Sequence, residues 1–391
     1  MQSPEKADES DNLPKSELSK DSDSSSVESS TETFQSFELD DKYVVKKLVA
    51  VGNMGRVYEG ETKLVKRRIA IKILHSEFVD NPEMLLRFKL EAEIASSLNH
   101  PNIVNVFGSG VTAAGEPYIA MDFVDGHSLE AVLKDGSKID TTRCADIFLQ
   151  LARAMEYTHE KGVIHRDIKP SNVMLHNEPG NKYLVKLLDF GIAKSTSVEA
   201  TVARELTLPG TVFGSVLYMS PEQILGKKVN FDSDIYSFGC LLFHALTGKP
   251  PYQSNNAIDC MQMHVKEAIP NVAEYLANDQ NAKQWSDVVS TCMQKDPSQR
   301  FESTQSLRAA IEKISESVTI QRAITESTEA LAIPGTSEKR PSKNDMLAAG
   351  SVLLIAGVLF VIPMLININL AKAANPPVKK ETSNPESTAA E

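Results

Sequence analysis

The sequence has few cysteines, a single tryptophan and no excess of basic residues. Its four cysteines are Cys144, Cys240, Cys260 and Cys292, and they form neither a C-x-x-C pair nor a cluster with histidines at zinc-ligand spacing. We interpret them as reduced, buried side chains rather than disulfides or metal ligands, which favours the cytosol for the region that contains them. The net charge of -11 argues against the basic face that nucleic-acid binding needs, so we expect no nucleic-acid partner.

The first 36 residues have almost no aliphatic side chains. They contain nine acidic residues and three lysines, which gives a net charge of -6. Such a segment buries too little apolar surface to offset the entropy lost on ordering, so we predict that residues 1–36 form a disordered acidic tail. It has no charged start followed by an apolar stretch, so we expect no secretory signal peptide.

The middle of the chain has the composition of an ordinary globular protein. Over the whole chain, 41% of the residues are hydrophobic and 24% are charged, which is close to the average for globular proteins. The length of 391 residues is enough for two or three domains. From residue 43, short runs of Val and Leu broken by Gly predict a strand, a turn and a strand, and a further strand is predicted over residues 68–74. Apolar residues at helical spacing predict helices over residues 82–99 and 141–161.

One loop of this region combines an acid, a base and an amide. Residues 165–172 read His-Arg-Asp-Ile-Lys-Pro-Ser-Asn, which is the pattern H-R-D-x-x-x-x-N, and Asp189-Phe190-Gly191 follows it. Upstream, Lys72 is an isolated charge inside an apolar strand, where uncompensated burial would be costly. The tripeptide His-Arg-Asp alone recurs by chance, but the full spacing with these partners is specific, and it resembles the catalytic machinery of protein kinases.

The resemblance covers residues 43–314 and implies a fold and a class. It implies an α+β, two-lobed protein kinase domain, with a small β-rich N-lobe over residues 43–121 and a larger helical C-lobe over residues 125–314. Lys169, two residues after Asp167, resembles the serine/threonine branch. The chain is thus similar to bacterial, eukaryotic-like (Hanks-type) serine/threonine kinases.

The resemblance also implies a nucleotide site beneath the glycine-containing hairpin, which would lie over the phosphates of ATP. The chain departs from the family there, because Ala50 stands where the first glycine is expected, and we expect a stiffer loop. Met121 occupies the position that closes the back of the nucleotide pocket in the family. A methionine here could equally be an ordinary residue of the hydrophobic core. The implied ATP-binding residues are Ala50, Val51, Gly52, Gly55, Val57, Ala70, Lys72, Met121, Asp122, Val124 and Met174.

The catalytic roles follow from the same resemblance. Asp167 would accept the proton of the attacking hydroxyl, and Lys169 would neutralise charge on the phosphoryl group. Lys72 would hold the α- and β-phosphates and pair with Glu91, which the family arrangement selects over Glu93. A carboxylate and an amide, from Asp189 and Asn172, would hold Mg²⁺ or Mn²⁺.

Other residues carry regulatory or structural expectations. Residues 192–214 resemble an activation loop, with Thr207 and Thr211 as phosphate acceptors and Arg166 as the residue that pairs with the phosphate. Pro209 stands where related loops often have a second threonine, which leaves the regulatory pair open. The implied structural residues are Glu222, Arg300 and Asp234, of which the first two would form an ion pair and the third would brace the catalytic loop.

The C-terminal part contains an uncharged stretch. Residues 315–345 form a linker rich in Ser, Thr and Glu, and residues 346–366 contain no charged side chain, which is about the length that crosses a bilayer. We predict a single transmembrane helix there, followed by a short tail outside the cell over residues 367–391; a buried core helix is the alternative. The flanking charges do not decide the orientation, but the need for ATP places the kinase domain in the cytoplasm. Gly350 and Gly357 give a weak signal for a homodimer.

These observations predict a membrane-anchored serine/threonine kinase that uses ATP and Mg²⁺, acts on Ser or Thr of protein substrates and phosphorylates its own activation loop. One alternative is a pseudokinase or an ATP-binding scaffold, and only the Ala50 replacement supports it. A second alternative is a membrane receptor, but the tail after the predicted span is too short for a folded sensor.

Overall fold

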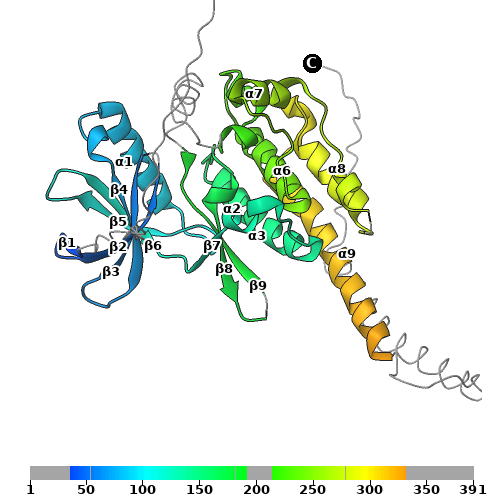
Figure 1. Cartoon of the computed structure of the whole chain (residues 1–391), viewed down its shortest axis with the longest axis horizontal. Coiled ribbons are helices and arrows are strands. Elements are labelled where there is room, and N and C mark those ends of the chain that lie inside the picture. The colour runs from blue at the N-terminus through cyan, green and yellow to red at the C-terminus, as the bar shows by residue number, and fades with distance from the viewer. Residues whose placement is uncertain (1–35, 53, 181, 192–213, 278, 332–391) are drawn as a thin grey trace, which may run out of the picture. The chain divides into compact units, whose positions relative to one another are not determined.

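The computed structural model describes residues 36–52, 54–180, 182–191, 214–277 and 279–331 (Figure 1). In this part of the chain, a strand-rich region is followed by a helix-rich region, and they form two lobes, an N-lobe and a C-lobe (Figure 1). The expected α+β, two-lobed architecture is therefore present.

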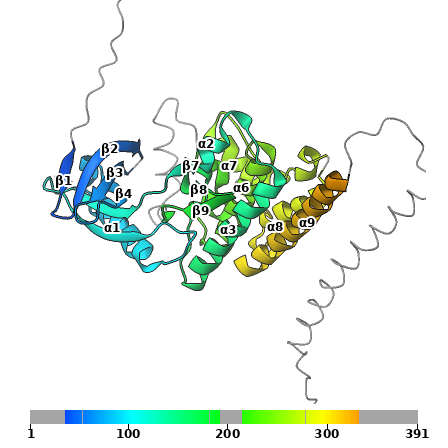
Figure 2. The ribbon, with the colours of Figure 1, turned by 90° about the horizontal axis from the view of Figure 1, so that it is seen from below.

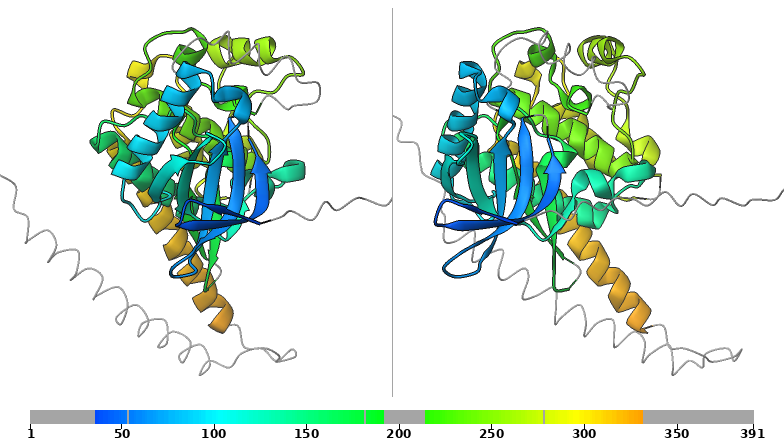
Figure 3. Two further views of the ribbon diagram at one scale, coloured as in Figure 1. Left: turned by 90° about the vertical axis from the view of Figure 1, so that its left-hand side faces the viewer. Right: turned by 60° about the vertical axis from the view of Figure 1, so that its left-hand side comes forward.

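The N-lobe is built on a six-stranded antiparallel sheet with the order β1-β2-β3-β4-β6-β5. One helix, α1 (Pro82–Ser97), packs beside it, as the two views of Figure 3 show. A short 3-10 turn at Ser76–Phe78 connects the sheet to this helix. The strands are β1 (Phe37–Leu39), β2 (Tyr43–Val51), β3 (Gly55–Thr62), β4 (Arg68–Leu74), β5 (Val106–Val111) and β6 (Pro117–Asp122).

Strand β4 divides its side chains between the two faces of this sheet. Successive side chains of a strand point to opposite faces, so Ile69, Ile71 and Ile73 share one face and are buried together in the smaller hydrophobic cluster. Ala70 and Lys72 belong to the other face. The alternation of the sequence thus places Lys72 on the face that α1 covers.

Helix α1 begins with a clear capping signal. The side chain of Asn81 accepts hydrogen bonds from the N–H groups of Glu83 and Met84, and Pro82 occupies the first turn. Its buried face is mainly apolar and includes Phe88. Glu91 lies on the same buried face, although it carries a charge.

The C-lobe contains most of the helices and a three-stranded sheet with the order β7-β8-β9. Helices α8 and α9 run side by side next to α3 in Figure 2. The helices are α2 (Leu129–Val132), α3 (Thr141–Glu160), α5 (Pro221–Ile224), α6 (Phe231–Thr247), α7 (Ala257–Lys266), α8 (Ala282–Cys292) and α9 (Thr304–Leu331). The strands are β7 (Gly126–Ser128), β8 (Val173–Glu178) and β9 (Lys182–Leu187).

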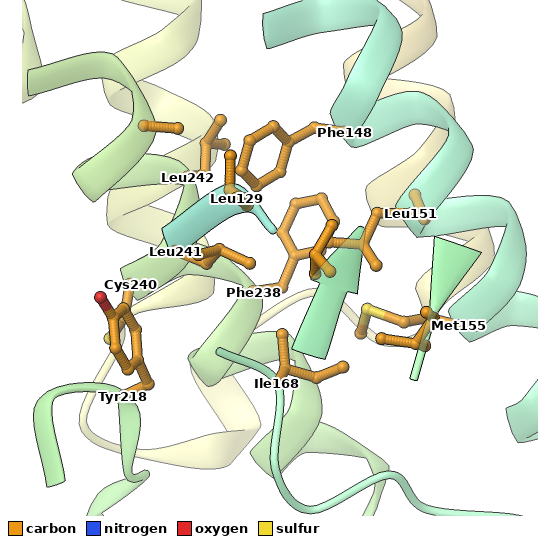
Figure 4. Close-up of a cluster of buried hydrophobic side chains, with 14 of the residues drawn as sticks. Leu129, Phe148, Leu151, Met155, Ile168, Tyr218, Phe238, Cys240, Leu241 and Leu242 are labelled. Atoms are coloured by element: carbon orange, nitrogen blue, oxygen red, sulfur yellow. The ribbon is translucent and has the colours of Figure 1, made fainter. Parts of the chain in front are cut away.

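The core of the C-lobe lies around α6, which is buried on nearly all sides. Phe148 of α3 and Phe238 of α6 meet edge to face with their ring centroids 5.2 Å apart (Figure 4). Ile168 of the catalytic loop points into the same cluster and is fully buried (Figure 4). Because its two neighbours are Asp167 and Lys169, this apolar anchor fixes the backbone that carries both groups.

All four cysteines are buried and unpaired with one another, as the sequence analysis expects. Burial raises the pKa of each thiol well above its ordinary value. A thiol under these conditions is a small apolar side chain rather than a nucleophile.

The structure differs from the sequence analysis at two boundaries. Strand β1 precedes the expected start of the domain at residue 43. Helix α9 continues past residue 314 to Leu331, because Val318 is still buried, so the first part of the predicted linker is helical. No helix among the described residues is both apolar enough and long enough for a membrane span, and the stretch predicted to cross, residues 346–366, lies outside the described residues.

Candidate active site

The catalytic loop, residues 165–172, lies between α3 and β8, and Asp234 of α6 binds its backbone. The two carboxylate oxygens of Asp234 accept the backbone N–H groups of His165 and Arg166, each at 2.7 Å. His159 of α3 also contacts this carboxylate, with its Nε2 atom 2.9 Å from Oδ2. Asp234 therefore braces the loop backbone at the position that the sequence analysis assigns to it.

Two polar side chains of the loop contact Asp167. The ammonium of Lys169 lies 2.9 Å from Oδ2 of Asp167. Asn172 donates its Nδ2 hydrogens to the carbonyl oxygen of Asp167 at 2.8 Å and to its Oδ2 at 3.2 Å. Lys169 also donates to the hydroxyl of Ser215 at 3.2 Å. Ser215 was not among the predicted site residues.

Lys72 joins the N-lobe to the catalytic loop region. Its ammonium lies 2.6 Å from Glu91 and 3.2 Å from Asp189. Burial alone would lower the pKa of Lys72, but the two carboxylates outweigh it and hold that pKa above its ordinary value, so the ammonium stays charged. Burial raises the pKa of Glu91, and the adjacent ammonium opposes that rise.

The segment Asp189-Phe190-Gly191 packs directly on the catalytic loop. The ring of His165 contacts the carbonyl of Leu188 at 2.8 Å, and its centroid lies 4.8 Å from that of Phe190. Gly191 donates its N–H to the carbonyl of His165 at 2.8 Å. A Cβ at position 191 would lie 2.6 Å from the Cβ of Asp167, so only glycine fits. Burial lowers the pKa of His165, which keeps its ring neutral.

The oxygen atoms near Asp167 fit a hard divalent cation. Asn172 uses its amide nitrogen for Asp167, which leaves its side-chain carbonyl oxygen able to coordinate a cation. Asp189 offers a partly exposed carboxylate. Mg²⁺ is usually held by one or two such groups together with substrate phosphates. Accordingly, the described residues contain no cluster of three or more His, Cys, Asp or Glu side chains that could hold a metal alone.

The glycine-containing hairpin joins β2 to β3 and is tied to the end of β4. The Nε2 atom of His75 lies 2.9 Å from the carbonyl of Gly52, and its backbone N–H donates to Met54 at 2.9 Å. A Cβ at Gly55 would lie 2.2 Å from the carbonyl oxygen of Ile73, so the strand contact requires glycine there. Ala50, the departure from the family pattern, continues the strand opposite Val57. His75 is a further contact that the sequence analysis did not identify.

The remaining nucleotide-site residues lie on neighbouring strands. Ala70 is paired with Met121 across β4 and β6, and Val57 is paired with Lys72 across β3 and β4. The N–H of Asp122 donates to the backbone carbonyl of Asn105 at 3.0 Å. Val124 packs against the main core, and Met174 lies in β8. A small cavity behind Met121 is lined by Glu91, Ala95, Val104, Val106, Ile119, Met121, Asp189 and Phe190.

Comparison with known proteins agrees with this geometry. The protein kinase domain family matches residues 43–310. The chain belongs to the protein kinase family.

Named relatives within this family come from several bacteria. The serine/threonine-protein kinase PknB of Mycobacterium tuberculosis is 33% identical over 282 residues, which is 71% of this chain and 43% of the relative. A probable serine/threonine-protein kinase of Streptomyces coelicolor is 34% identical over 277 residues, which is 70% of this chain and 40% of the relative. The chain thus spans less than half the length of these relatives.

Among solved structures, the kinase domain of PknI from Mycobacterium tuberculosis is similar to this chain. The TM-score is 0.54 and the sequence identity is 25%. The match covers 71% of this chain and 98% of the PknI structure. The similarity therefore extends over a complete kinase domain.

Two kinase residues form the expected ion pair at the base of the C-lobe. Arg300 donates both terminal nitrogens to Glu222, at 2.7 and 2.9 Å, and its side chain is fully buried. Ser233 adds a hydrogen bond to the same carboxylate at 2.6 Å. Burial would raise the pKa of Glu222, but the hydrogen bonds and the charge of Arg300 lower it overall. The pair fixes α5 to the segment that precedes α9, and the hydrogen bond from Ser233 links the same carboxylate to the start of α6.

Of the residues expected to accept or bind the activation-loop phosphate, only Arg166 lies within the described residues. Thr207 and Thr211 lie outside them. Arg166 is described and half-buried, and its backbone has a φ of 65°. Within the described part of the chain, no hydrogen bond or ion pair of its guanidinium is present, so this group is available for an anionic partner.

Proposed function

We propose that the chain is a serine/threonine protein kinase that transfers the γ-phosphoryl group of ATP to hydroxyl groups of protein substrates. The observation that carries this proposal is one connected set of contacts. Glu91, Lys72 and Asp189 form one group, and Lys169, Asp167 and Asn172 form the other. The packing of Gly191 on Asp167 joins the two groups.

In the proposed reaction, Asp167 orients the substrate hydroxyl and accepts its proton. A bond forms between the hydroxyl oxygen and the γ-phosphorus, and the bond from that phosphorus to the β,γ-bridging oxygen breaks. Lys169 stabilises the negative charge on the phosphoryl group during transfer, and Lys72 holds the α- and β-phosphates. Asp189 and Asn172 would hold Mg²⁺ or Mn²⁺, which neutralises phosphate charge when bound.

A comparison of the wild type with Asp167→Asn tests this function. We expect the variant to bind ATP normally and to transfer phosphate about 10³-fold more slowly, since it lacks the proton acceptor. Equal phosphorylation by both proteins would contradict the mechanism. A wild type that binds ATP but phosphorylates neither itself nor a generic protein substrate would favour the pseudokinase alternative.

The acceptor is proposed to be Ser or Thr rather than Tyr. The position of Lys169, two residues after the base and bonded to Ser215, supports this choice, and so do the printed names of the relatives. Phosphoamino-acid analysis of a labelled substrate tests it, and phosphotyrosine as the main product would overturn it.

The chain is further proposed to phosphorylate its own activation loop at Thr207 or Thr211. The support is the guanidinium of Arg166, which is half-buried and available for a phosphate. Mass spectrometry of protein incubated with ATP should find phosphate in residues 192–214 of the wild type but not of Asp167→Asn. Replacement of both threonines by alanine should then abolish this signal.

We propose membrane anchoring through residues 346–366, with the kinase domain in the cytoplasm. The support is the uncharged stretch in the sequence. Deletion of residues 346–391 should move the protein from the membrane fraction to the soluble fraction and leave its ATP turnover intact. A full chain that fractionates as a soluble protein would overturn the proposal. Cross-linking of the full chain and of the deletion variant would test whether this stretch forms a homodimer.

A further inference from the structure

Gln223, in the short helix α5, contacts two separate parts of the molecule. Its Oε1 atom accepts the backbone N–H of Ser220 at 3.0 Å and the hydroxyl of Ser220 at 3.1 Å. Its Nε2 atom donates to the carbonyl oxygen of Arg166 at 3.0 Å. The amide orientation follows from these partners, because the reverse orientation would place Nε2 against two donors and Oε1 against a carbonyl.

The carbonyl that Gln223 contacts belongs to the peptide immediately before Asp167. Arg166 has a φ of 65°, in the left-handed region that residues with side chains rarely adopt. Such a conformation persists only when its surroundings hold it. Asp234 binds the N–H of Arg166 at 2.7 Å, and Gln223 binds its carbonyl. The N–H of Asp167, in the same peptide plane, contacts Nδ1 of His165 at 3.3 Å.

We propose that Gln223 is a positioning residue that fixes the peptide plane between Arg166 and Asp167 and thereby aims the catalytic carboxylate. This inference rests on the proposed kinase activity. Gln223 has a second role as part of a capping box with Ser220, in which each residue bonds to the backbone of the other. The two roles use different atoms, so they can be separated by mutation.

Gln223→Glu and Ser220→Ala form a matched pair of variants. A glutamate at position 223 can still accept from Ser220 and complete the capping box, but it loses the donor to Arg166. An alanine at position 220 removes the hydroxyl from the cap and leaves the Nε2 donor in place. We expect Gln223→Glu to lose about tenfold in kcat with an unchanged KM for ATP. We expect Ser220→Ala to lower the melting temperature and keep kcat within about twofold.

A double variant that combines Gln223→Glu with Asp234→Asn adds a second test. Its result would not change if Gln223 acted only as a helix cap. Both residues fix the same strained backbone, so the combined loss of kcat should be smaller than the product of the two single losses. Fully multiplicative losses, or a loss of kcat in Ser220→Ala equal to that in Gln223→Glu, would overturn the inference.

Hydrogen exchange provides a test that does not depend on activity. We expect faster amide exchange in residues 164–168 of Gln223→Glu than in the wild type or in Ser220→Ala, because the peptide has lost one of its supports. Unchanged exchange in Gln223→Glu would overturn the inference even if every variant were active. Failure of the proposed kinase function would appear separately, as equal phosphate transfer by the wild type and Asp167→Asn.

Discussion

The ammonium of Lys72 lies 2.6 Å from the carboxylate of Glu91, and both side chains are buried. The pair connects β4 to α1, so the position of the helix determines whether Lys72 lies in the site. Asp189 is a second partner of the same ammonium at 3.2 Å. Lys72 is therefore held between a residue of the N-lobe and one that follows the catalytic loop.

Replacement of Glu91 by glutamine should lower kcat/KM for ATP by about 100-fold, because Lys72 loses one of its two carboxylate partners. The loss should not be larger, because Asp189 still compensates the charge of Lys72. Steady-state kinetics with varied ATP would measure the effect. Glu93 is exposed on the same helix, so Glu93→Gln is a matched control that should behave as the wild type. Equal losses in the two variants would contradict the role of the pair.

Ser215→Ala should lower kcat by about tenfold and leave the KM for ATP unchanged, because Lys169 loses the hydroxyl that holds it beside Asp167. Ser215→Thr keeps a hydroxyl at this position and should retain most of the activity. The comparison of the two variants measures the hydrogen bond rather than the side-chain volume. If both variants were as active as the wild type, the contact would have no role in transfer.

His75→Ala should raise the KM for ATP by about fivefold with a smaller change in kcat, because the hairpin at Gly52 loses its link to the end of β4. His75→Gln can supply a donor of similar reach and should restore part of the affinity. Equilibrium binding of a fluorescent ATP analogue measures this without turnover. Equal affinities for wild type and His75→Ala would show that the hairpin does not depend on this contact.

Stability should fall as the pH is lowered from about 6.5, because several histidines are buried in their neutral form. Burial lowers the pKa of His264 to about 3 and that of His244 to about 4. Between these values and about pH 6.5 the unfolded chain binds more protons than the folded chain, so each histidine reduces the free energy of unfolding by up to about 1.4 kcal/mol per pH unit.

His264→Asn should reduce this pH dependence by about one proton, because asparagine does not titrate. The fold should be kept, because the asparagine side chain can still accept from the hydroxyl of Tyr236, which lies 3.0 Å from Nδ1 of His264. Urea unfolding at pH 7, 6 and 5 would measure the slope. His127 is exposed, so His127→Asn should keep the slope of the wild type. An unchanged slope in His264→Asn would mean that His264 is protonated in the folded chain.

Much of the site could be predicted because its residues belong to ordered motifs with fixed spacing. Glu91, Asp234 and the pair of Glu222 with Arg300 lie where the motif pattern places them. The strand predicted over residues 68–74 around Lys72 likewise has the observed bounds of β4. In each of these cases the residue type itself carries the information, since a buried charge needs a partner.

The contacts that were missed have no such signal. His75 binds a backbone carbonyl 23 residues away, and Ser215 binds Lys169 across 46 residues. Gln223 binds the carbonyl of Arg166 across 57 residues. His75 and Gln223 bind backbone carbonyls, and because every residue has a carbonyl, the type of the side chain does not reveal its partner. Only the folded arrangement brings each pair together.

The fold boundaries were missed for a different reason. Strand β1 has three residues, which is too short for a periodic pattern. Residues 315–331 are rich in Ser, Thr and Glu, which resembles a linker, yet they extend α9 because the helix is already anchored by Ile311 and Ile314. Tertiary packing therefore determines these ends more than local composition does.

The burial of all four cysteines makes the native protein a suitable background for site-specific labelling. Maleimide reagents require an accessible thiolate, which none of these side chains presents. A single cysteine introduced on the surface, for example at Lys66 near the tip of the β3–β4 hairpin, should react far faster than the native ones. Pairs of such probes on the two lobes would report lobe closure on nucleotide binding without removal of any native cysteine.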